Sequence, residues 1–203
     1  MSYLENYFNR VPRELRKSSA IAYMAAFDHL KTNNPFIIEK IIQELQDQRC
    51  FLKLIASENY CSEAVQLAMG NWLTDKYAEG YPYHRFYAGC DNIDAIEATC
   101  VSEAKTIFQC DHAYVQPHSG ADANLVAFWA VLVARIQNKE VEKLGKKNIN
   151  DLSKEEHEQV RQLLVNQKVL GMSLNSGGHL THGYRHNISA KMMQAFCYEV
   201  DSN

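Results

Sequence analysis

A serine–glycine pair at 119–120 separates a short apolar stretch from a long one, and this arrangement constrains the fold more than any other feature. The stretch from Ala113 to Gln116 is typical of a strand, and Asp122 to Ile136 is typical of a helix. A strand that leads through a tight turn into a helix is half of a βαβ unit. We therefore expect an α/β protein whose sheet is mostly parallel.

The rest of the chain predicts further helices and strands. Apolar residues at helical spacing predict helices at 12–29, 35–49, 63–73 and 94–108. Apolar runs predict strands at 168–174 and 196–200, and a short buried strand or an extended segment at 52–56. Residues from about 136 to 167 are polar and include the capping-box sequence Ser153 to Glu156, so we expect a surface helical insertion there. The expected organisation is an N-terminal helical arm at 1–50 and one large domain at 51–203.

Composition argues against several classes of protein. The formal charge is −3 with acidic and basic residues interleaved, which argues against a nucleic-acid partner. No apolar run approaches the ~18 residues of a membrane span, and no secretory signal is recognisable, so we expect a cytoplasmic protein that does not enter a membrane. Its six cysteines form no C-x-x-C pair and are expected to be reduced, mostly buried thiols, with no metal site.

The run from Gln116 to Asn124 is a candidate anion site. A helix that begins at Ser119-Gly120 presents unpaired N–H groups and the positive end of its dipole to a phosphate. Glycine lets a phosphate approach the backbone, and the serine hydroxyl adds a donor. The alternative is an ordinary helix cap with a turn glycine.

The run from Gly177 to Gly183 places His179 and His182 beside bare glycine backbone. An imidazole in such a turn can lie flat against an aromatic ligand. The H-x-x-H spacing also occurs in metal sites, but no acidic or thiol partner stands in the run. A purely structural histidine pair is the third reading.

An aromatic loop offers a third candidate site. Tyr77 and Glu79 supply a phenol and a carboxylate, and a carboxylate shielded by aromatic rings can exchange a proton near neutral pH. The alternative is a solvated glutamate beside surface tyrosines. The following aromatic residues around Arg85 also suit an oligomer contact, because Tyr and Arg are enriched at interface centres.

In their order along the chain, these motifs make it resemble the N-terminal part of serine hydroxymethyltransferase, a fold-type I pyridoxal-phosphate enzyme. The resemblance covers about 50–134 and 168–201. It runs through Leu54 to Tyr60, Lys76 to Pro82, Gln116 to Asn124 and Gly177 to Gly183. The fold it implies is the first part of a large domain, with a mainly parallel sheet flanked by helices. The activity it implies is interconversion of serine and glycine with tetrahydrofolate as the one-carbon acceptor.

The resemblance also implies roles for individual residues. Ser119 and Gly120 would hold the cofactor phosphate, and His179 would stack on its pyridine ring. Ser57 would lie beside the amino-acid substrate, and Glu79 would carry a proton. Tyr77, Tyr87 and Glu79 would complete the site, partly across a dimer interface, and His182 would lie near it. The expected folate contacts are Leu174, Gly178 and Leu180. The family's dimers or tetramers imply a homo-oligomer.

Two departures from the family's pattern stand out. The stretch from Tyr83 to Ala88 replaces Gly-Lys-Arg-Tyr-Tyr-Gly, so that Tyr83 stands for a glycine and Phe86 lacks a phenol hydroxyl. The family's Schiff-base lysine lies in a Thr-Thr-His-Lys-Thr string that these 203 residues do not contain. We therefore expect a fragment with an incomplete cofactor-binding domain, inactive on its own, because the chemistry needs an amine held against the cofactor aldehyde.

Two other interpretations remain open. One is a non-catalytic interaction module that pairs with a full-length enzyme. The other is a fragment of a different fold-type I enzyme, such as an aminotransferase or a threonine aldolase. An interrupted parallel sheet leaves an apolar strand edge uncovered, so in any of these cases we expect marginal stability and self-association.

Overall fold

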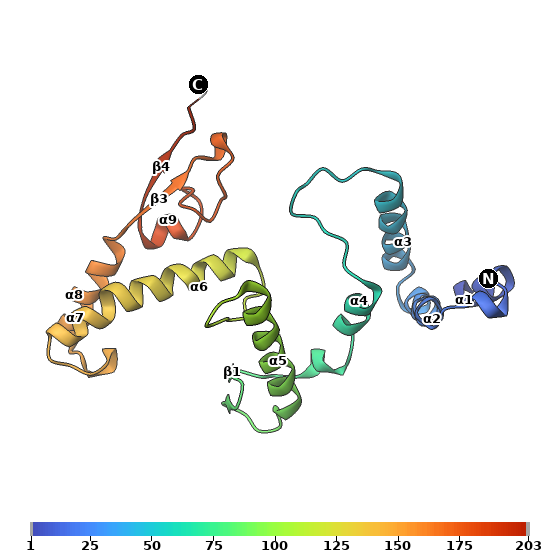
Figure 1. Ribbon diagram of the computed structural model, residues 1–203, viewed down its shortest axis with the longest axis horizontal. Coiled ribbons are helices and arrows are strands. Elements are labelled where there is room, and N and C mark those ends of the chain that lie inside the picture. The colour runs from blue at the N-terminus through green and yellow to red at the C-terminus, as the bar shows by residue number, and fades with distance from the viewer. Residues whose placement is uncertain (1, 202–203) are drawn as a thin grey trace. The chain divides into compact units, whose positions relative to one another are not determined.

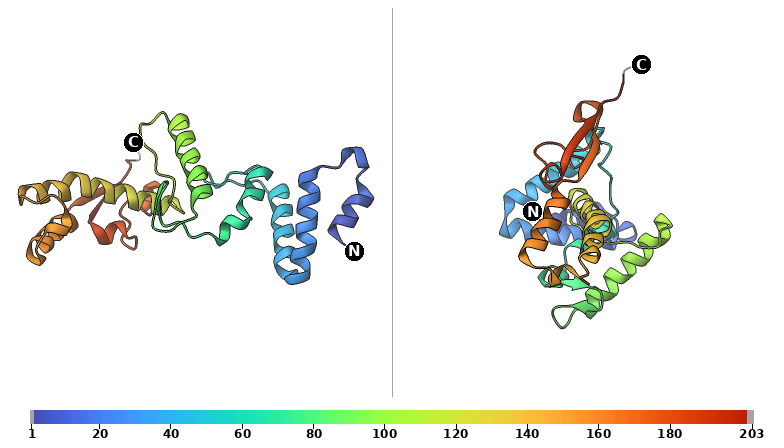
Figure 2. Two further views of the ribbon diagram at one scale, coloured as in Figure 1. Left: turned by 90° about the horizontal axis from the view of Figure 1, so that it is seen from below. Right: turned by 90° about the vertical axis from the view of Figure 1, so that its left-hand side faces the viewer.

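The computed structural model of the protein describes residues 2–201 (Figure 1). The chain forms two compact units, of which the first ends at Glu79 and the second begins at Gly80. The first unit is helical, and Figure 2 shows its helices α1, α2 and α3 side by side. Its elements are α1 (Tyr3–Arg10), η1 (Arg13–Leu15), α2 (Ser18–Asn33), α3 (Pro35–Cys50), α4 (Glu63–Met69) and η2 (Trp72–Asp75).

Polar caps fix where the helices of the first unit begin. Asp28 of α2 holds the start of α1, since its carboxylate accepts from the backbone N–H of Tyr3 at 2.6 Å and of Leu4 at 3.1 Å. The Ser2 hydroxyl also donates to this carboxylate, and these bonds lower the pKa of Asp28. Helix α3 begins at Pro35 as predicted, and Ser62 caps α4 as predicted.

Three expectations for the first unit were wrong. The helix predicted at 12–29 begins only at Ser18, after a 3₁₀ turn, and continues to Asn33. The helix predicted at 63–73 ends at Met69. Of the two alternatives at 52–56, the buried strand was wrong; these residues are exposed and irregular, because an apolar run becomes a strand only where a partner strand pairs with it, and none pairs with it in residues 2–201.

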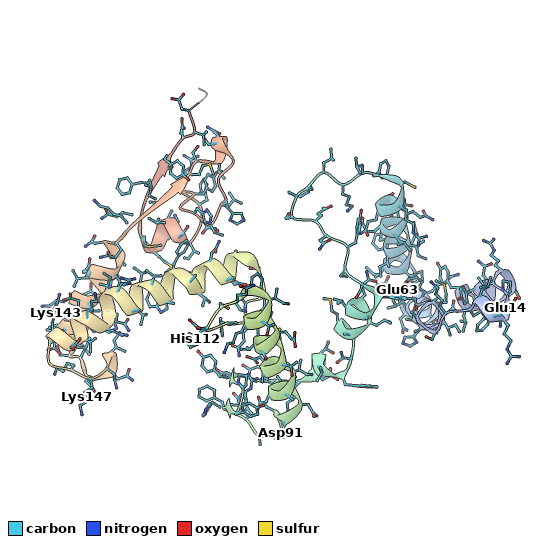
Figure 3. All side chains as sticks on the ribbon, in the orientation of Figure 1. Glu14, Glu63, Asp91, His112, Lys143 and Lys147 are labelled. Atoms are coloured by element: carbon cyan, nitrogen blue, oxygen red, sulfur yellow. The ribbon has the colours of Figure 1, made fainter. Side chains whose placement is uncertain are left out.

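The second unit combines helices with two small sheets. Helix α5 starts at Asp91, and His112 lies just beyond its other end (Figure 3). The elements of this unit are β1 (Gly80–Tyr81), β2 (His84–Arg85), α5 (Asp91–Phe108), α6 (Gly120–Leu132), η3 (Val133–Gln137), α7 (Asn138–Lys143), η4 (Ile149–Asp151), α8 (Lys154–Val165), β3 (Lys168–Met172), η5 (Leu174–Ser176), α9 (Ser189–Met192) and β4 (Gln194–Tyr198).

The two sheets differ in direction. Strands β3 and β4 pair in parallel, from Lys168 opposite Gln194 to Met172 opposite Tyr198, so the predicted parallel pairing and both strands are confirmed with shifted ends. Strands β1 and β2 form a short antiparallel hairpin. The strand predicted at 113–116 is absent, because no described segment pairs with that backbone.

The polar stretch at 136–167 does more than extend the surface. Its capping box is present, with Ser153 and Glu156 satisfying each other's backbone N–H groups at the start of α8. From α8, Val160 and Leu164 pack with Leu132 of α6 and with Met193 in the buried core of this unit. The expected surface excursion therefore supplies half of the buried residues in that cluster.

Helices α6 and α7 run into each other without a break, which confirms the helix predicted at 122–136. The join is η3, a π-helical turn of five residues from Val133 to Gln137. Such a wide turn accommodates an extra residue within a continuous helix. Buried residues lie on both sides of it, Leu132 before and Val141 after.

The expectation of mostly buried cysteines was wrong. Only Cys90 is buried; the other five are exposed, because the helix faces and strand β4 on which several of them lie have no covering layer in the described part of the chain. Between residues 2 and 201, no helix is both long enough and apolar enough to cross a membrane.

Candidate functional site

The start of α6 leaves backbone donors exposed. Ser119 is its N-cap, and the Ser119 hydroxyl oxygen accepts from the N–H of Asp122 at 3.0 Å. The N–H groups of Gly120 and Ala121, at the first two helical positions, have no hydrogen-bond partner among residues 2–201. A Cβ added at Gly120 meets no atom within 4 Å, so neither packing nor backbone conformation requires glycine there.

The glycine run from Gly177 to Gly183 folds back against strand β3. Gly177 has φ +94°, a conformation that favours glycine, and the N–H of Gly178 donates to the carbonyl of Ser173 at 2.8 Å. A Cβ on Gly178 collides with the carbonyl of Met172, and a Cβ on Gly171 collides with that of His182. In contrast to Gly120, these glycines are required by the fold itself.

A buried threonine connects this loop to helix α6. The Thr181 hydroxyl oxygen lies 2.7 Å from Nδ1 of His179 and accepts from the side-chain amide of Asn124, also at 2.7 Å. Asn124 lies in α6, five positions after its cap Ser119, which corresponds to about 7.5 Å along the helix axis. The structure thus places His179 and the helix that begins at Ser119-Gly120 in one hydrogen-bonded unit.

The other predicted residues of the loop are accessible. The rings of His179 and His182 lie with centroids 5.6 Å apart at 55°, and both residues are exposed. Leu174 and Leu180 are 41% and 50% exposed, so their apolar side chains are available to a ligand. Among the described residues, no group of three or more His, Cys, Asp or Glu side chains is arranged to hold a metal ion.

Arg85 anchors the β1–β2 hairpin to helix α5. Its guanidinium donates to Asp94 at 2.7 Å and to Glu97 at 2.6 Å, and its side chain is only 4% exposed. A third bond runs to the carbonyl of Gly80 at 2.9 Å. The Arg85 guanidinium, with help from the Tyr83 N–H, holds the pKa of Asp94 below its usual range, so this carboxylate stays charged at neutral pH.

Gln116 extends the same network to the segment before the anion site. Its amide donates to the carbonyl of Gly80 at 2.8 Å and to Glu97 at 2.7 Å, and its oxygen accepts from the Tyr114 hydroxyl at 2.9 Å. The segment predicted as a strand is therefore held through side chains. It connects the hairpin and α5 to the run that begins at Gln116.

Tyr87 follows the hairpin and is 50% exposed. Cys90, four residues before Asp94, donates its thiol to the Tyr87 carbonyl at 3.5 Å. The aromatic rings of Tyr83 and Phe86 are also exposed, at 72% and 77%. Each of these three aromatic residues is thus at least half exposed in the described structure.

Three predicted residues belong to the first compact unit. Ser57 lies in an exposed turn that Lys53 tethers, since the Lys53 ammonium reaches Glu44 at 3.2 Å and Glu58 at 3.3 Å. Tyr77 is 68% exposed and Glu79 is exposed as well. The exposure of Glu79 corresponds to the alternative of a solvated loop glutamate, and its role in proton transfer stays a prediction.

The sequence did not single out Thr181, Asn124 or Gln116 as functional on their own. Each lies inside or at the end of one of the two conspicuous runs, which was the available signal. Their contacts cross 57 residues for Asn124 and Thr181, and 19 or more for Gln116 with Glu97 and Gly80. Local pattern carries no information on such pairings.

Known proteins resemble this chain along most of its length. A sequence model of the serine hydroxymethyltransferase family matches residues 30–142, more than half of the chain. The chain belongs to the serine hydroxymethyltransferase family. A serine hydroxymethyltransferase of Treponema pallidum is 53% identical over 192 residues, which is 95% of this chain and 33% of that protein.

Two further serine hydroxymethyltransferases give the same result. The protein of Chlamydia muridarum is 51% identical over 202 residues, covering 98% of this chain and 41% of its own length. That of Mycolicibacterium smegmatis is 52% identical over 181 residues, covering 89% and 37%. The chain thus spans a third to two fifths of these serine hydroxymethyltransferases, and the family resemblance found in the sequence is confirmed.

Proposed function

We propose that this chain carries the phosphate-binding and ring-binding part of a pyridoxal-phosphate site. The enzyme to which the site belongs would interconvert serine and glycine with tetrahydrofolate as the one-carbon acceptor. One observation carries the proposal: an open helix start at Ser119-Gly120 is joined to the imidazole of His179 through Asn124 and Thr181.

The residues present fit the cofactor. The unpaired N–H groups of Gly120 and Ala121, with the Ser119 hydroxyl, match a phosphate that needs donors rather than a cation. The exposed ring of His179 offers a flat face to the pyridine. When bound, pyridoxal phosphate supplies an electron sink for bonds at the α-carbon of the substrate.

The remaining predicted residues take supporting roles in this proposal. By the family resemblance, Ser57 and Tyr87 are assigned to binding of the amino acid, and Glu79, Tyr77 and His182 are assigned to proton transfer at the serine hydroxyl. Leu174, Gly178 and Leu180 contact the folate. The exposure of Leu174 and Leu180 suits this use, because an apolar side chain kept in solvent gains free energy when a ligand covers it.

We also propose that the chain works in a homo-oligomer, a dimer or a tetramer. The aromatic side chains of Tyr81, Tyr83 and Phe86 are 61%, 72% and 77% exposed, a composition suited to an interface centre.

The 203 residues alone contain no lysine in a Thr-Thr-His-Lys-Thr string. We therefore expect the chain alone to bind the cofactor without turning over serine, and measurable glycine formation would contradict this.

The binding proposal is tested by Gly120→Asp. An acidic residue at the first position of a helix favours the helix dipole, so the fold is preserved, while its carboxylate repels the phosphate. We expect wild-type chain to bind pyridoxal phosphate in calorimetry and Gly120→Asp to lose binding at least 10-fold, which corresponds to about 1.4 kcal/mol.

Lys154→Asp is the matched control, because Lys154 holds the same first position in α8, away from the site. It should bind the cofactor as the wild-type chain does. If a folded Gly120→Asp chain bound the cofactor as tightly as the wild-type chain, the phosphate would not bind at the start of α6, and the proposal would be wrong.

A further inference from the structure

Thr181 differs from its neighbours in the glycine run. It is 4% exposed, whereas His179 and His182 on either side are exposed. Burying a hydroxyl costs free energy unless hydrogen bonds satisfy it. The Thr181 hydroxyl has two partners, the Asn124 amide and Nδ1 of His179. A threonine so placed acts on the residues that surround it.

The direction of each hydrogen bond follows from two groups that can only donate, the side-chain NH₂ of Asn124 and the backbone N–H of Thr181. The amide of Asn124 donates to the Thr181 oxygen at 2.7 Å. The backbone N–H of Thr181 donates to Nδ1 of His179 at 3.2 Å, so Nδ1 carries no proton. The Thr181 hydroxyl, 2.7 Å away, must then donate its hydrogen to the same Nδ1.

Two consequences follow for the imidazole. The proton of the neutral ring sits on Nε2, because Nδ1 accepts from two donors of one residue. The ring is also held along its Nδ1 edge, while His179 as a whole stays exposed. Since Asn124 belongs to α6, these hydrogen bonds fix the orientation of the His179 ring relative to the helix that begins after Ser119.

We propose that Thr181 is a positioning residue which, with Asn124, locks His179 as the Nε2–H tautomer and ties its ring to the start of α6. This inference rests on the proposed function, since it makes one rigid unit of the two places that would hold the phosphate and the ring of one cofactor. The pair contributes no contact to the cofactor itself and acts only through His179.

The tautomer is measured directly by NMR of the 203-residue chain with ¹⁵N-labelled histidine, without any cofactor. Thr181→Val removes the hydroxyl at nearly constant volume, and Thr181→Ser retains it. We expect wild-type chain and Thr181→Ser to show a protonated Nε2 and a hydrogen-bonded Nδ1. In Thr181→Val, the Nδ1 signal should move toward that of a free acceptor nitrogen.

A second variant protects the test against a misfolded Thr181→Val chain. Asn124→Asp turns the donor into an acceptor, which draws the Thr181 hydroxyl hydrogen away from Nδ1 and predicts the same signal change. Asn124 is partly exposed, so the carboxylate of Asn124→Asp should disturb folding less than a substitution at the buried Thr181. A proton on Nδ1 in the wild-type chain, or an unchanged Nδ1 signal in a folded Thr181→Val or Asn124→Asp chain, would overturn the inference.

Calorimetry with pyridoxal phosphate and with inorganic phosphate separates this inference from the proposed function. Loss of one neutral hydrogen bond predicts about 3- to 10-fold weaker binding of pyridoxal phosphate to Thr181→Val, rescue by Thr181→Ser, and unchanged binding of inorganic phosphate. Equal binding by Thr181→Val and Thr181→Ser overturns the inference alone. If the wild-type chain shows the locked tautomer but no affinity for pyridoxal phosphate, the proposed function falls, and with it the role of Thr181 toward the cofactor.

Discussion

The guanidinium of Arg85 and the carboxylate of Asp94 lie 2.7 Å apart, with their side chains only 4% and 8% exposed. This pair fixes the β1–β2 hairpin to helix α5, and Gln116 and Glu97 extend it toward the start of α6. Removing one partner of a buried pair leaves the other charge uncompensated.

The pair makes stability depend on acid. The folded pKa of Asp94 is lowered from 3.8, so its contribution is fully present above about pH 4 and is lost as the pH falls toward the lower folded value. We expect Asp94→Asn to lower the urea midpoint at pH 7 and to flatten the loss of stability below pH 4. Asp91→Asn, an exposed carboxylate of the same helix, should keep the acid dependence of the original chain.

The hairpin turn contains a residue in an unfavourable conformation. Tyr83 has φ +64°, directly after Pro82, in the position where a type II turn favours glycine. Tyr83→Gly removes about 1–2 kcal/mol of strain, and glycine's added chain entropy costs about 0.5–1 kcal/mol. We expect urea unfolding to report a net gain of about 0.5–1 kcal/mol.

Tyr81→Gly is the control for that prediction, since Tyr81 lies in β1, before the two central residues of the turn, and its ring contacts that of Tyr114. It should destabilise the chain. A loss of stability in both variants would mean that the Tyr83 ring contributes more than its backbone strain costs.

Two adjacent leucines of α8 differ in burial, because only one of them belongs to the core. Leu164 is 6% exposed and packs in the cluster with Leu132, whereas Leu163 is 42% exposed. We expect Leu164→Ala to lower the free energy of unfolding by about 2–5 kcal/mol, and Leu163→Ala by less than about 1 kcal/mol. Similar small losses would show that the 136–167 stretch does not support the core.

The β3–β4 pair predicts self-association. Leu170 and Phe196 are register partners, 67% and 50% exposed, and the outer edges of both strands are unpaired in residues 2–201. Sedimentation velocity should therefore depend on concentration, and Leu170→Lys should weaken that dependence. Leu15→Lys, at a 65% exposed position outside any sheet, should not.

The helices could be predicted because their signals are local. Ser62 and Ser153 each mark a start by accepting a hydrogen bond from a backbone N–H three positions on, and Pro35 marks one through its fixed φ at the first helical turn; the structure has all three starts. The strands were harder, because 168–174 and 113–116 are both short and apolar, yet only the first found a partner strand. Strand pairing depends on segments that are distant in the sequence, so a short apolar sequence does not predict whether it will be paired.

The same limit applies to the site. The two runs that hold Ser119 and His179 stood out because their glycines and polar residues are contiguous. That Asn124 meets Thr181, and that Arg85 meets both Asp94 and Glu97, depends on tertiary contacts. Gly120 and Gly178 also look alike in sequence, but only the structure separates a glycine with open space from one that packing requires.

The π-helical turn at Val133–Gln137 changes the phase of one long helix. Leu132 and Val141 are nine residues apart, and about 100° per residue would set them on opposite faces of a regular α-helix, yet both are buried. The residue absorbed by the wide turn rotates everything after it by about one step, which swings Val141 back toward the side of Leu132. Because the wide turn already absorbs one residue, a single-residue deletion inside it would leave a regular α-helix whose second half keeps nearly the same face toward the core.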